Sequence, residues 1–170
     1  EYLATNSNGT LLLNWFLDTC NLAHRHSILA PNLVTHIVEL CRHRLASLTV
    51  LKVLNYRGDE CARRDILEAI FGNPQSDEVV QSLHQILCDN NYGPTFIYKV
   101  LTMSLLEGDV RTHAIKQVRK VLLETTPSQQ HRRVMEEVGL AATNSHSPNR
   151  PRSSISPVLT QDGNHLRGLS

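Results

Sequence analysis

The chain has 170 residues, a net charge of +1 and 41% hydrophobic residues, enough for one domain with a real core. Its seven Pro and eight Gly are too few for a collagen-like or generally disordered chain. No run approaches the roughly 18 apolar residues of a membrane span. Four scattered Cys without a C-x-x-C pair predict reduced thiols of an intracellular protein rather than a disulfide framework.

Helical periodicity dominates the sequence between about residues 10 and 124, where apolar residues recur every three or four positions and no long stretch alternates like a strand. Pro31 suits a first helical turn, and Ser76 with Asp77 can cap a helix that follows the break at 72–74. The predicted helices are residues 10–20, 31–42, 45–56, 61–71, 77–87, 93–105 and 109–123.

The C-terminal part differs in composition. Residues 129–142 can form one short helix with Val134 and Val138 as a narrow apolar stripe, within a segment that we delimit as 125–142. Residues 143–170 are rich in Ser, Pro, Asn and Arg and poor in apolar side chains. Such a segment cannot bury enough surface to offset its chain entropy, so we predict a disordered tail there.

Three stretches share one layout, in which a short polar approach and a small residue precede an aliphatic helix. They are "NSNGTLLLNWFL", "HRLASLTVLKVL" and "NNYGPTFIYKVL". When Gly9, Ala46 and Gly93 are set equivalent, the intervals are 37 and 47 residues, and the longer one contains an insertion around "GNPQSDEV". Intervals of this size are typical of helical solenoids, in which each hairpin buries its apolar face against its neighbours.

At these three helices the chain resembles the Pumilio (PUF) family of RNA-binding repeat proteins. "HRLASLTVLKVL" looks like the repeat before the last, and "DNNYGPTFIYKVL" looks like the last repeat, which in the family typically ends in "YGNYVVQK". "VRTHAIKQVRKVLLE" resembles the helix that follows the final repeat, and the beginning of the sequence is similar to divergent fungal members. The resemblance covers about residues 1–124, as the C-terminal part of a longer repeat array.

The resemblance implies an all-α fold, a right-handed α-solenoid of stacked helical PUF-like repeats. It further implies binding of single-stranded RNA, namely mRNA 3′ untranslated regions, in cytoplasmic post-transcriptional regulation. Proteins of the repression machinery are implied as partners, and neither a cofactor nor a metal is expected.

In that family, two side chains four residues apart on the second helix bind the Watson–Crick edge of one base, and the residue after the first of them stacks between bases. Positions i and i+4 project from one face of a helix, so this spacing suits a base edge. The implied edge-reading pairs are Thr10 with Asn14, Ser47 with Leu51, and Pro94 with Tyr98. The implied stacking residues are Leu11, Leu48 and Thr95.

These residues depart from the family pattern, which usually pairs Asn, Ser or Cys with Gln or Glu. Leu51 cannot hydrogen-bond and Pro94 has no donor, so Ser47 would make only half of a contact. No stacking position is aromatic or Arg, so the roughly 1–3 kcal/mol per base that an aromatic platform supplies is missing. We therefore expect weak base specificity from these repeats.

Charge within the second repeat favours RNA. Residues 42–57 contain Arg42, Arg44, Lys52 and Arg57 without an acidic residue. This group is consistent with a phosphate-binding track whose contribution falls as salt rises, although such a cluster is more often just a solvated surface.

Several candidates have structural alternatives. Ser47 also suits a close helix crossing, and Tyr98 also suits a core position with a bonded hydroxyl. We favour core packing for Trp15, and a solvent-facing or RNA-facing position for Asn14 because a buried amide needs partners.

Other functional classes find little support. The sequence contains no zinc-finger spacing and no glycine-rich phosphate loop, G-x-S-x-G or H-E-x-x-H motif, so we predict no enzyme. The main alternative to RNA binding is a protein-interaction solenoid, in which Leu48, Leu51 and Pro94 contact a partner protein.

Overall fold

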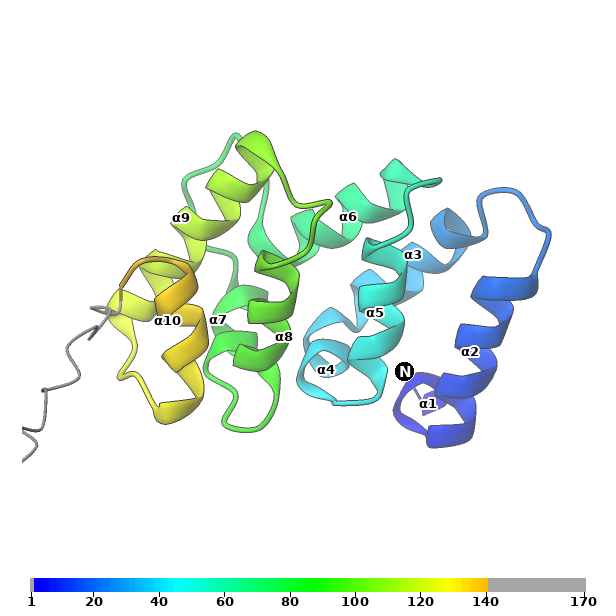
Figure 1. The fold of residues 1–170 in the computed structure, drawn as a ribbon, viewed down its shortest axis with the longest axis horizontal. Helices are drawn as coiled ribbons and strands as arrows, with labels where there is room; N and C mark the ends of the chain where they lie inside the picture. Colours follow the sequence, from blue (N-terminus) through cyan, green and yellow to red (C-terminus); the bar gives the residue numbers. More distant parts are fainter. Residues whose placement is uncertain (1, 141–170) are drawn as a thin grey trace, which may run out of the picture.

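The computed structural model of the chain describes residues 2–140, so the tail predicted for 143–170 lies outside the described residues. Within that range the structure is all helical and has three units of three helices each (Figure 1). The first unit contains α1 (Tyr2–Thr5), α2 (Ser7–Thr19) and α3 (Arg25–Thr35). The second contains α4 (Ile37–Arg42), α5 (Ala46–Leu54) and α6 (Glu60–Phe71), and the third contains α7 (Gln81–Leu87), α8 (Gly93–Leu101) and α9 (Gly108–Glu124).

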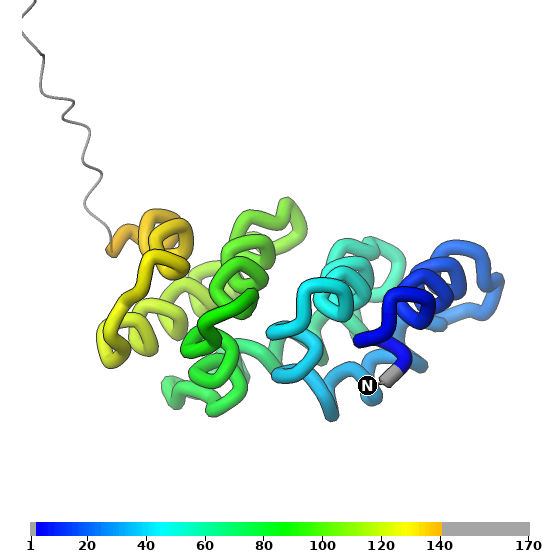
Figure 2. Tube along the Cα trace, turned by 90° about the horizontal axis from the view of Figure 1, so that it is seen from below, coloured from blue at the N-terminus to red at the C-terminus, as the bar shows by residue number. Residues whose placement is uncertain are grey.

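The units follow one another along the long axis of the molecule (Figure 2). Equivalent helices of neighbouring units pack together, α2 on α5, α3 on α6 and α4 on α7. Helices α2, α5 and α8 form one layer in both views, and α10 (Arg132–Glu137) extends it beside α8. The prediction of an all-α solenoid of stacked helical units is confirmed.

Small residues at the start of the second helix of each unit permit a close approach of backbone. A Cβ atom at Gly93 would lie 1.8 Å from the carbonyl oxygen of Ile86, and one at Gly9 would lie 1.9 Å from that of Leu3. Both distances are far inside van der Waals contact, so no side chain fits there. The equivalent Ala46 is completely buried. The shared small residue therefore reflects the crossing of the first and second helices of a unit.

The core runs through all three units. Spacings of three and four residues place apolar side chains on the buried sides of the helices. In α5 and α8 the completely buried side chains include Val50, Val53, Leu54, Phe96, Ile97, Val100 and Leu101. Trp15 is an exception to our expectation, because it is 62% exposed on α2 of the first unit rather than packed in the core.

The single helix predicted for 31–42 is wrong. Helix α3 begins at Arg25 and contains Pro31 in its interior, where the missing N–H removes one hydrogen bond of the helix. His36 leaves the helical conformation, with φ −118° and ψ 25°, so a separate helix α4 begins at Ile37. Units one and two are thus joined without a loop, which accounts for the shorter interval between their repeats.

The predicted start of a helix at Ser76 and Asp77 is also wrong, because α7 begins only at Gln81. The Ser76 hydroxyl accepts a hydrogen bond from the Glu78 N–H in a local turn, and the Asp77 carboxylate pairs with Lys116 of α9 at 2.6 Å. Residues 72–80 therefore form the connection that lengthens the interval before the third unit.

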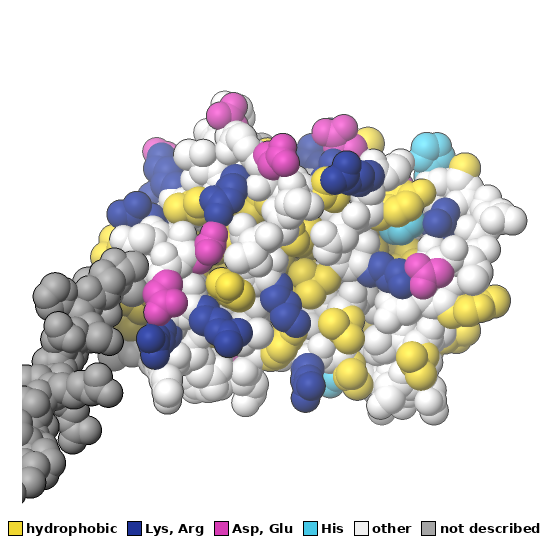
Figure 3. All heavy atoms as spheres, viewed as in Figure 1, with side chains coloured by type: hydrophobic (Ala, Val, Ile, Leu, Met, Phe, Trp, Pro, Cys, Tyr) yellow, Lys and Arg dark blue, Asp and Glu magenta, His cyan; other side chains and the backbone are white. Residues whose placement is uncertain are grey.

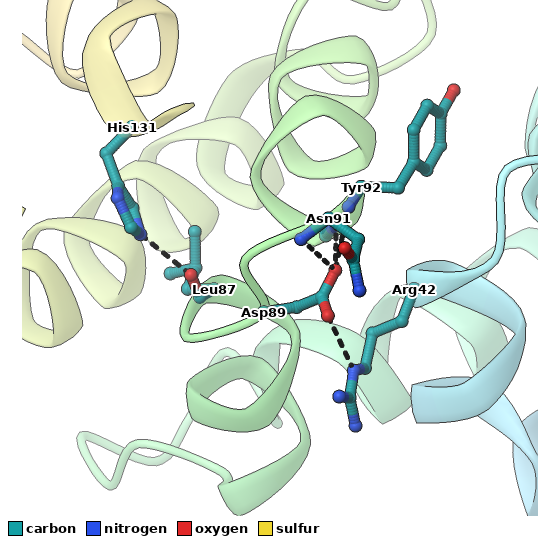
Figure 4. A network of polar contacts seen from close by, with 7 residues as sticks. Arg42, Leu87, Asp89, Asn91, Tyr92 and His131 are labelled. Carbon is teal, nitrogen blue, oxygen red and sulfur yellow. Dashed lines mark hydrogen bonds and ion pairs between the residues drawn. The ribbon is translucent and has the colours of Figure 1, made fainter. Parts of the chain in front are cut away.

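After α9 the chain turns back along α8 through a 3-10 turn (Gln129–His131) and α10. Val134 and Val138 are buried, as their spacing predicts. The His131 Nε2 lies 2.7 Å from the carbonyl oxygen of Leu87 (Figure 4). Its Nδ1 lies 3.0 Å from the backbone nitrogen of Ser128. These bonds require the tautomer with hydrogen on Nε2, and they attach the C-terminal helix to the third unit.

Candidate nucleic-acid interface

The candidate face is the exposed surface of helices α2, α5, α8 and α10. Figure 3 shows it with Lys and Arg side chains lying between hydrophobic ones, and acidic groups beside some of them. Every residue that the family pattern assigns to base contact belongs to three of these helices. The structure therefore brings the predicted residues onto one layer, in the order of the chain.

The first residue of each predicted pair is buried. The Thr10 hydroxyl donates to the carbonyl oxygen of Ala4 at 2.6 Å, and the Ser47 hydroxyl donates to that of Arg44 at 2.9 Å. Pro94 is buried at the first turn of α8. Since both hydroxyl hydrogens are used within the chain, the first positions present no donor on the candidate face. For Ser47 the structure favours a packing role, with a bond to the preceding turn.

The second residues of the pairs, Asn14, Leu51 and Tyr98, are all partly exposed. The Oδ1 atom of Asn14 is buried and has no hydrogen-bond partner among the described residues. An unsatisfied acceptor of this kind costs free energy unless a ligand or water supplies a donor. Because this oxygen is buried, Asn14 can accept a bond from a ligand on the candidate face only after its side chain rotates.

The three stacking positions lie at the surface, as the family pattern requires. Leu11 and Leu48 are 67% and 42% exposed, and Thr95 is half-buried. An exposed Leu gives a base an apolar contact but no aromatic stacking. Tyr98 supplies an aromatic group on α8, and the guanidinium carbon of Arg133 lies 5.9 Å from its ring centroid.

Acidic partners reduce the predicted phosphate track. Lys52 pairs with Asp18 of the first unit at 2.6 Å, and Arg42 donates through Nε to Asp89 of the third unit at 3.2 Å. Arg44 and Arg57 are exposed, and their side chains make no hydrogen bond or ion pair with other residues in the 2–140 range. Only part of the local charge is thus available for phosphate, because the fold brings carboxylates from neighbouring units beside two of the cations.

Asp89 organises the start of α8 (Figure 4). Its Oδ2 accepts hydrogen bonds from the backbone N–H groups of Asn91, Tyr92 and Gly93, at 3.2, 2.7 and 2.9 Å. Burial alone would raise the pKa of this carboxyl group, but these bonds and the one from Arg42 outweigh it and lower the pKa below its usual value. Asp89 therefore fixes the first turn of the helix that carries Thr95 and Tyr98.

A further cation lies on the same helix. Lys99 is exposed and donates to the Tyr92 hydroxyl at 2.8 Å, with its Nζ 5.4 Å from the centroid of that ring. Lys99, Asp18 and Arg133 were not among the predicted site residues. Lys99 has a sequence signal, because it occupies the same place in its repeat as Lys52. Asp18 and Arg133 have none, since only the fold brings them to the face.

The Cys and His residues near 20–26 and 41–43 form no metal site. No group of at least three His, Cys, Asp or Glu within residues 2–140 is placed to hold a metal ion. In that same part of the chain, no helix has the length and apolar character needed to cross a membrane.

No protein-family profile matches the chain. Its curated relatives are fungal proteins. Protein JSN1 of Saccharomyces cerevisiae is 57% identical over all of this chain and 17% of its own length. The mRNA-binding protein PUF2 of the same yeast is 43% identical over 96% of this chain and 17% of its length. A Pumilio domain-containing protein of Schizosaccharomyces pombe, C56F2.08c, is 37% identical over 93% of this chain and 22% of its length. The chain thus spans about a fifth of the length of these relatives.

Among solved structures, the chain is similar to the PUM-HD domain of S. pombe Puf1 in complex with RNA. The TM-score is 0.73 with 36% sequence identity, and the match covers 82% of this chain and 36% of the other.

Proposed function

The chain belongs to the Pumilio (PUF) family, and from this we propose that it binds single-stranded RNA through the surface of α2, α5, α8 and α10. The observation that carries the proposal is the likeness in fold and sequence to a Pumilio domain that was crystallised with RNA. The exposed Leu11 and Leu48, the Tyr98 ring and the nearby cations supply apolar, aromatic and phosphate-binding groups for such a ligand.

We infer weak base specificity for these three units. The hydroxyls of Thr10 and Ser47 are bonded within the chain, and the side chains of Leu51 and Pro94 carry no hydrogen-bonding group. Discrimination between bases depends on hydrogen bonds to their edges, which leaves Asn14 and the Tyr98 hydroxyl as the candidates. Much of the affinity would then come from phosphate and apolar contacts, which do not depend on sequence.

The cellular role is part of the same proposal. A relative named as an mRNA-binding protein supports mRNA as the ligand. The family resemblance extends this to 3′ untranslated regions, to post-transcriptional regulation in the cytoplasm, and to protein partners in repression.

RNA binding can be tested by fluorescence anisotropy with the intact protein and U-rich, UGU-containing and scrambled RNAs, each over a range of salt concentrations. We expect binding at low salt with a modest preference among the sequences. Lys52→Ala should weaken binding to all of them and reduce the salt slope, by less than the value of about 1 for an unpaired cation because Asp18 pairs with Lys52. The matched control is Lys116→Ala on α9, because this lysine also pairs with an aspartate at 2.6 Å but lies outside the candidate face. Absence of binding at low salt would refute the proposal.

The alternative is a solenoid that binds a partner protein. The exposed apolar side chains of the first unit favour it, because Leu11, Leu12 and Trp15 are 67%, 53% and 62% exposed. If the alternative holds, Leu48→Ala will abolish binding of the partner protein, and the RNA titrations will show no binding at any salt concentration.

A further inference from the structure

The candidate face continues beyond the third unit. Helix α10 packs against α8 and lies beside it in the same layer (Figure 1). The Arg133 side chain of α10 is exposed, and its guanidinium carbon lies 5.9 Å from the ring centroid of Tyr98 on α8. Helix α8 of the third unit and helix α10 thus place an aromatic ring and a guanidinium next to each other at one end of the face.

Arg133 differs from the other Lys and Arg residues within helices α2, α5, α8 and α10 in that its side chain has no polar partner. Lys52 pairs with Asp18, and the neighbouring Arg132 pairs with Glu136 at 3.0 Å. Lys99 donates to a tyrosine hydroxyl. The Arg133 side chain forms no hydrogen bond or ion pair with any residue in the described part of the chain. Its charge and its planar guanidinium are therefore available to a ligand without breaking a bond.

The two groups lie near each other without close stacking contact. In a closely stacked pair of this structure, His26 and Tyr56, the ring centroids are 3.8 Å apart. The distance of 5.9 Å between Arg133 and the Tyr98 ring is at the outer limit of a cation–π contact, which is about 6 Å. At this distance the guanidinium is not in close stacking contact with the ring, so a base that stacks on Tyr98 breaks no such contact.

We propose that Tyr98 and Arg133 together hold one nucleobase by stacking, at the end of the RNA-binding face beyond the three repeat helices. This inference rests on the proposed RNA binding and adds α10 to the interface. Bases splayed from a single strand stack on aromatic rings and on Arg guanidinium planes, largely regardless of base identity. The site would thus add affinity for one more nucleotide without adding sequence preference.

An abasic scan tests this inference. A bound RNA is synthesised with one abasic nucleotide at each position in turn, and its affinity for the intact protein is measured by anisotropy. One position should lose roughly 5- to 150-fold in affinity with the wild type, which corresponds to about 1–3 kcal/mol for a stacked base. In Tyr98→Ala and in Arg133→Ala, removal of the base at that same position should cost much less.

Two further variants separate stacking from a simple charge effect. Arg133→Lys keeps the charge but lacks the planar guanidinium, so it should behave like Arg133→Ala at the sensitive position. Arg132→Ala removes a neighbouring charge of α10 and should leave the scan as in the wild type. The stacking inference is wrong, although RNA binding stands, if Arg133→Lys retains the full wild-type affinity. It is also wrong if the Arg133 variants lose affinity by the same factor whichever nucleotide is abasic. If the wild type itself binds no RNA, both proposals fail.

Discussion

Replacement of Asp89 by Ala should destabilise the third unit and detach the first turn of α8. The carboxylate accepts three backbone N–H bonds, of which the one from Gly93 is buried, and a fourth bond from Arg42 of the preceding unit. Loss of the side chain leaves the buried N–H without a partner, which costs about 1–3 kcal/mol, and removes the bonds from Asn91 and Tyr92, each worth about 0.5–1.5 kcal/mol. The Arg42 side chain is 47% exposed, so its ion pair adds little. We expect a total loss of about 2–4 kcal/mol.

Urea denaturation followed by far-ultraviolet circular dichroism at neutral pH measures this loss. With a typical dependence on urea of about 2 kcal/mol per molar, the midpoint should fall by about 1–2 M. Asp77→Ala is the matched control, because hydrogen bonding and ion pairing with Lys116 also lower the pKa of Asp77 but its carboxylate is exposed to solvent. Its midpoint should hardly change. Equal shifts in the two variants would refute the argument that burial and the backbone bonds make Asp89 important.

Three other changes have defined outcomes. Asp18→Asn releases Lys52 from its ion pair and should increase RNA affinity and steepen its salt dependence, whereas Asp77→Asn, which releases Lys116 of α9, should do neither. Anisotropy titrations in which both variants behaved alike would contradict this reasoning. Gln117→Met replaces a completely buried amide that lacks hydrogen-bond partners among residues 2–140. The substitution should raise the free energy of unfolding by about 1–3 kcal/mol. A lower urea midpoint than in the wild type would contradict this prediction. The pKa of Asp89 is lower in the folded state than in the unfolded state, so the stability that its carboxylate contributes is complete above about pH 4 and is lost as pH falls through the folded-state pKa. Asp89→Asn should therefore lose less stability than the wild type between pH 7 and pH 3. Parallel losses in the two proteins would exclude this role.

Helical periodicity and the small residues Gly9, Ala46 and Gly93 were enough to predict the solenoid and its three equivalent helices. These signals are local, because an apolar stripe and a close helix crossing each depend on residues that are only a few positions apart in the sequence. The division of 31–42 at His36 was not predictable from the same signals, because Pro31 is tolerated inside α3 and the sequence shows no turn residue at the break.

The candidate site was predicted less completely than the fold. The spacing of four residues placed Asn14 and Tyr98 on helices of the candidate face, but it could not reveal that the Ser47 hydroxyl bonds back to Arg44. Partners distant in sequence were also hidden, because Asp18 and Lys52 meet only when the first two units stack. The same holds for Arg133, which reaches Tyr98 only after the chain reverses behind α9.

The central claim, that RNA lies on the layer of α2, α5, α8 and α10, is tested most directly by photo-crosslinking. RNA carrying 4-thiouridine is bound to the intact protein and irradiated, and the crosslinked peptides are identified by mass spectrometry. The account predicts crosslinks in the peptides that contain Leu48, Tyr98 and Arg133. Crosslinks confined to α3, α6 and α9 would contradict it.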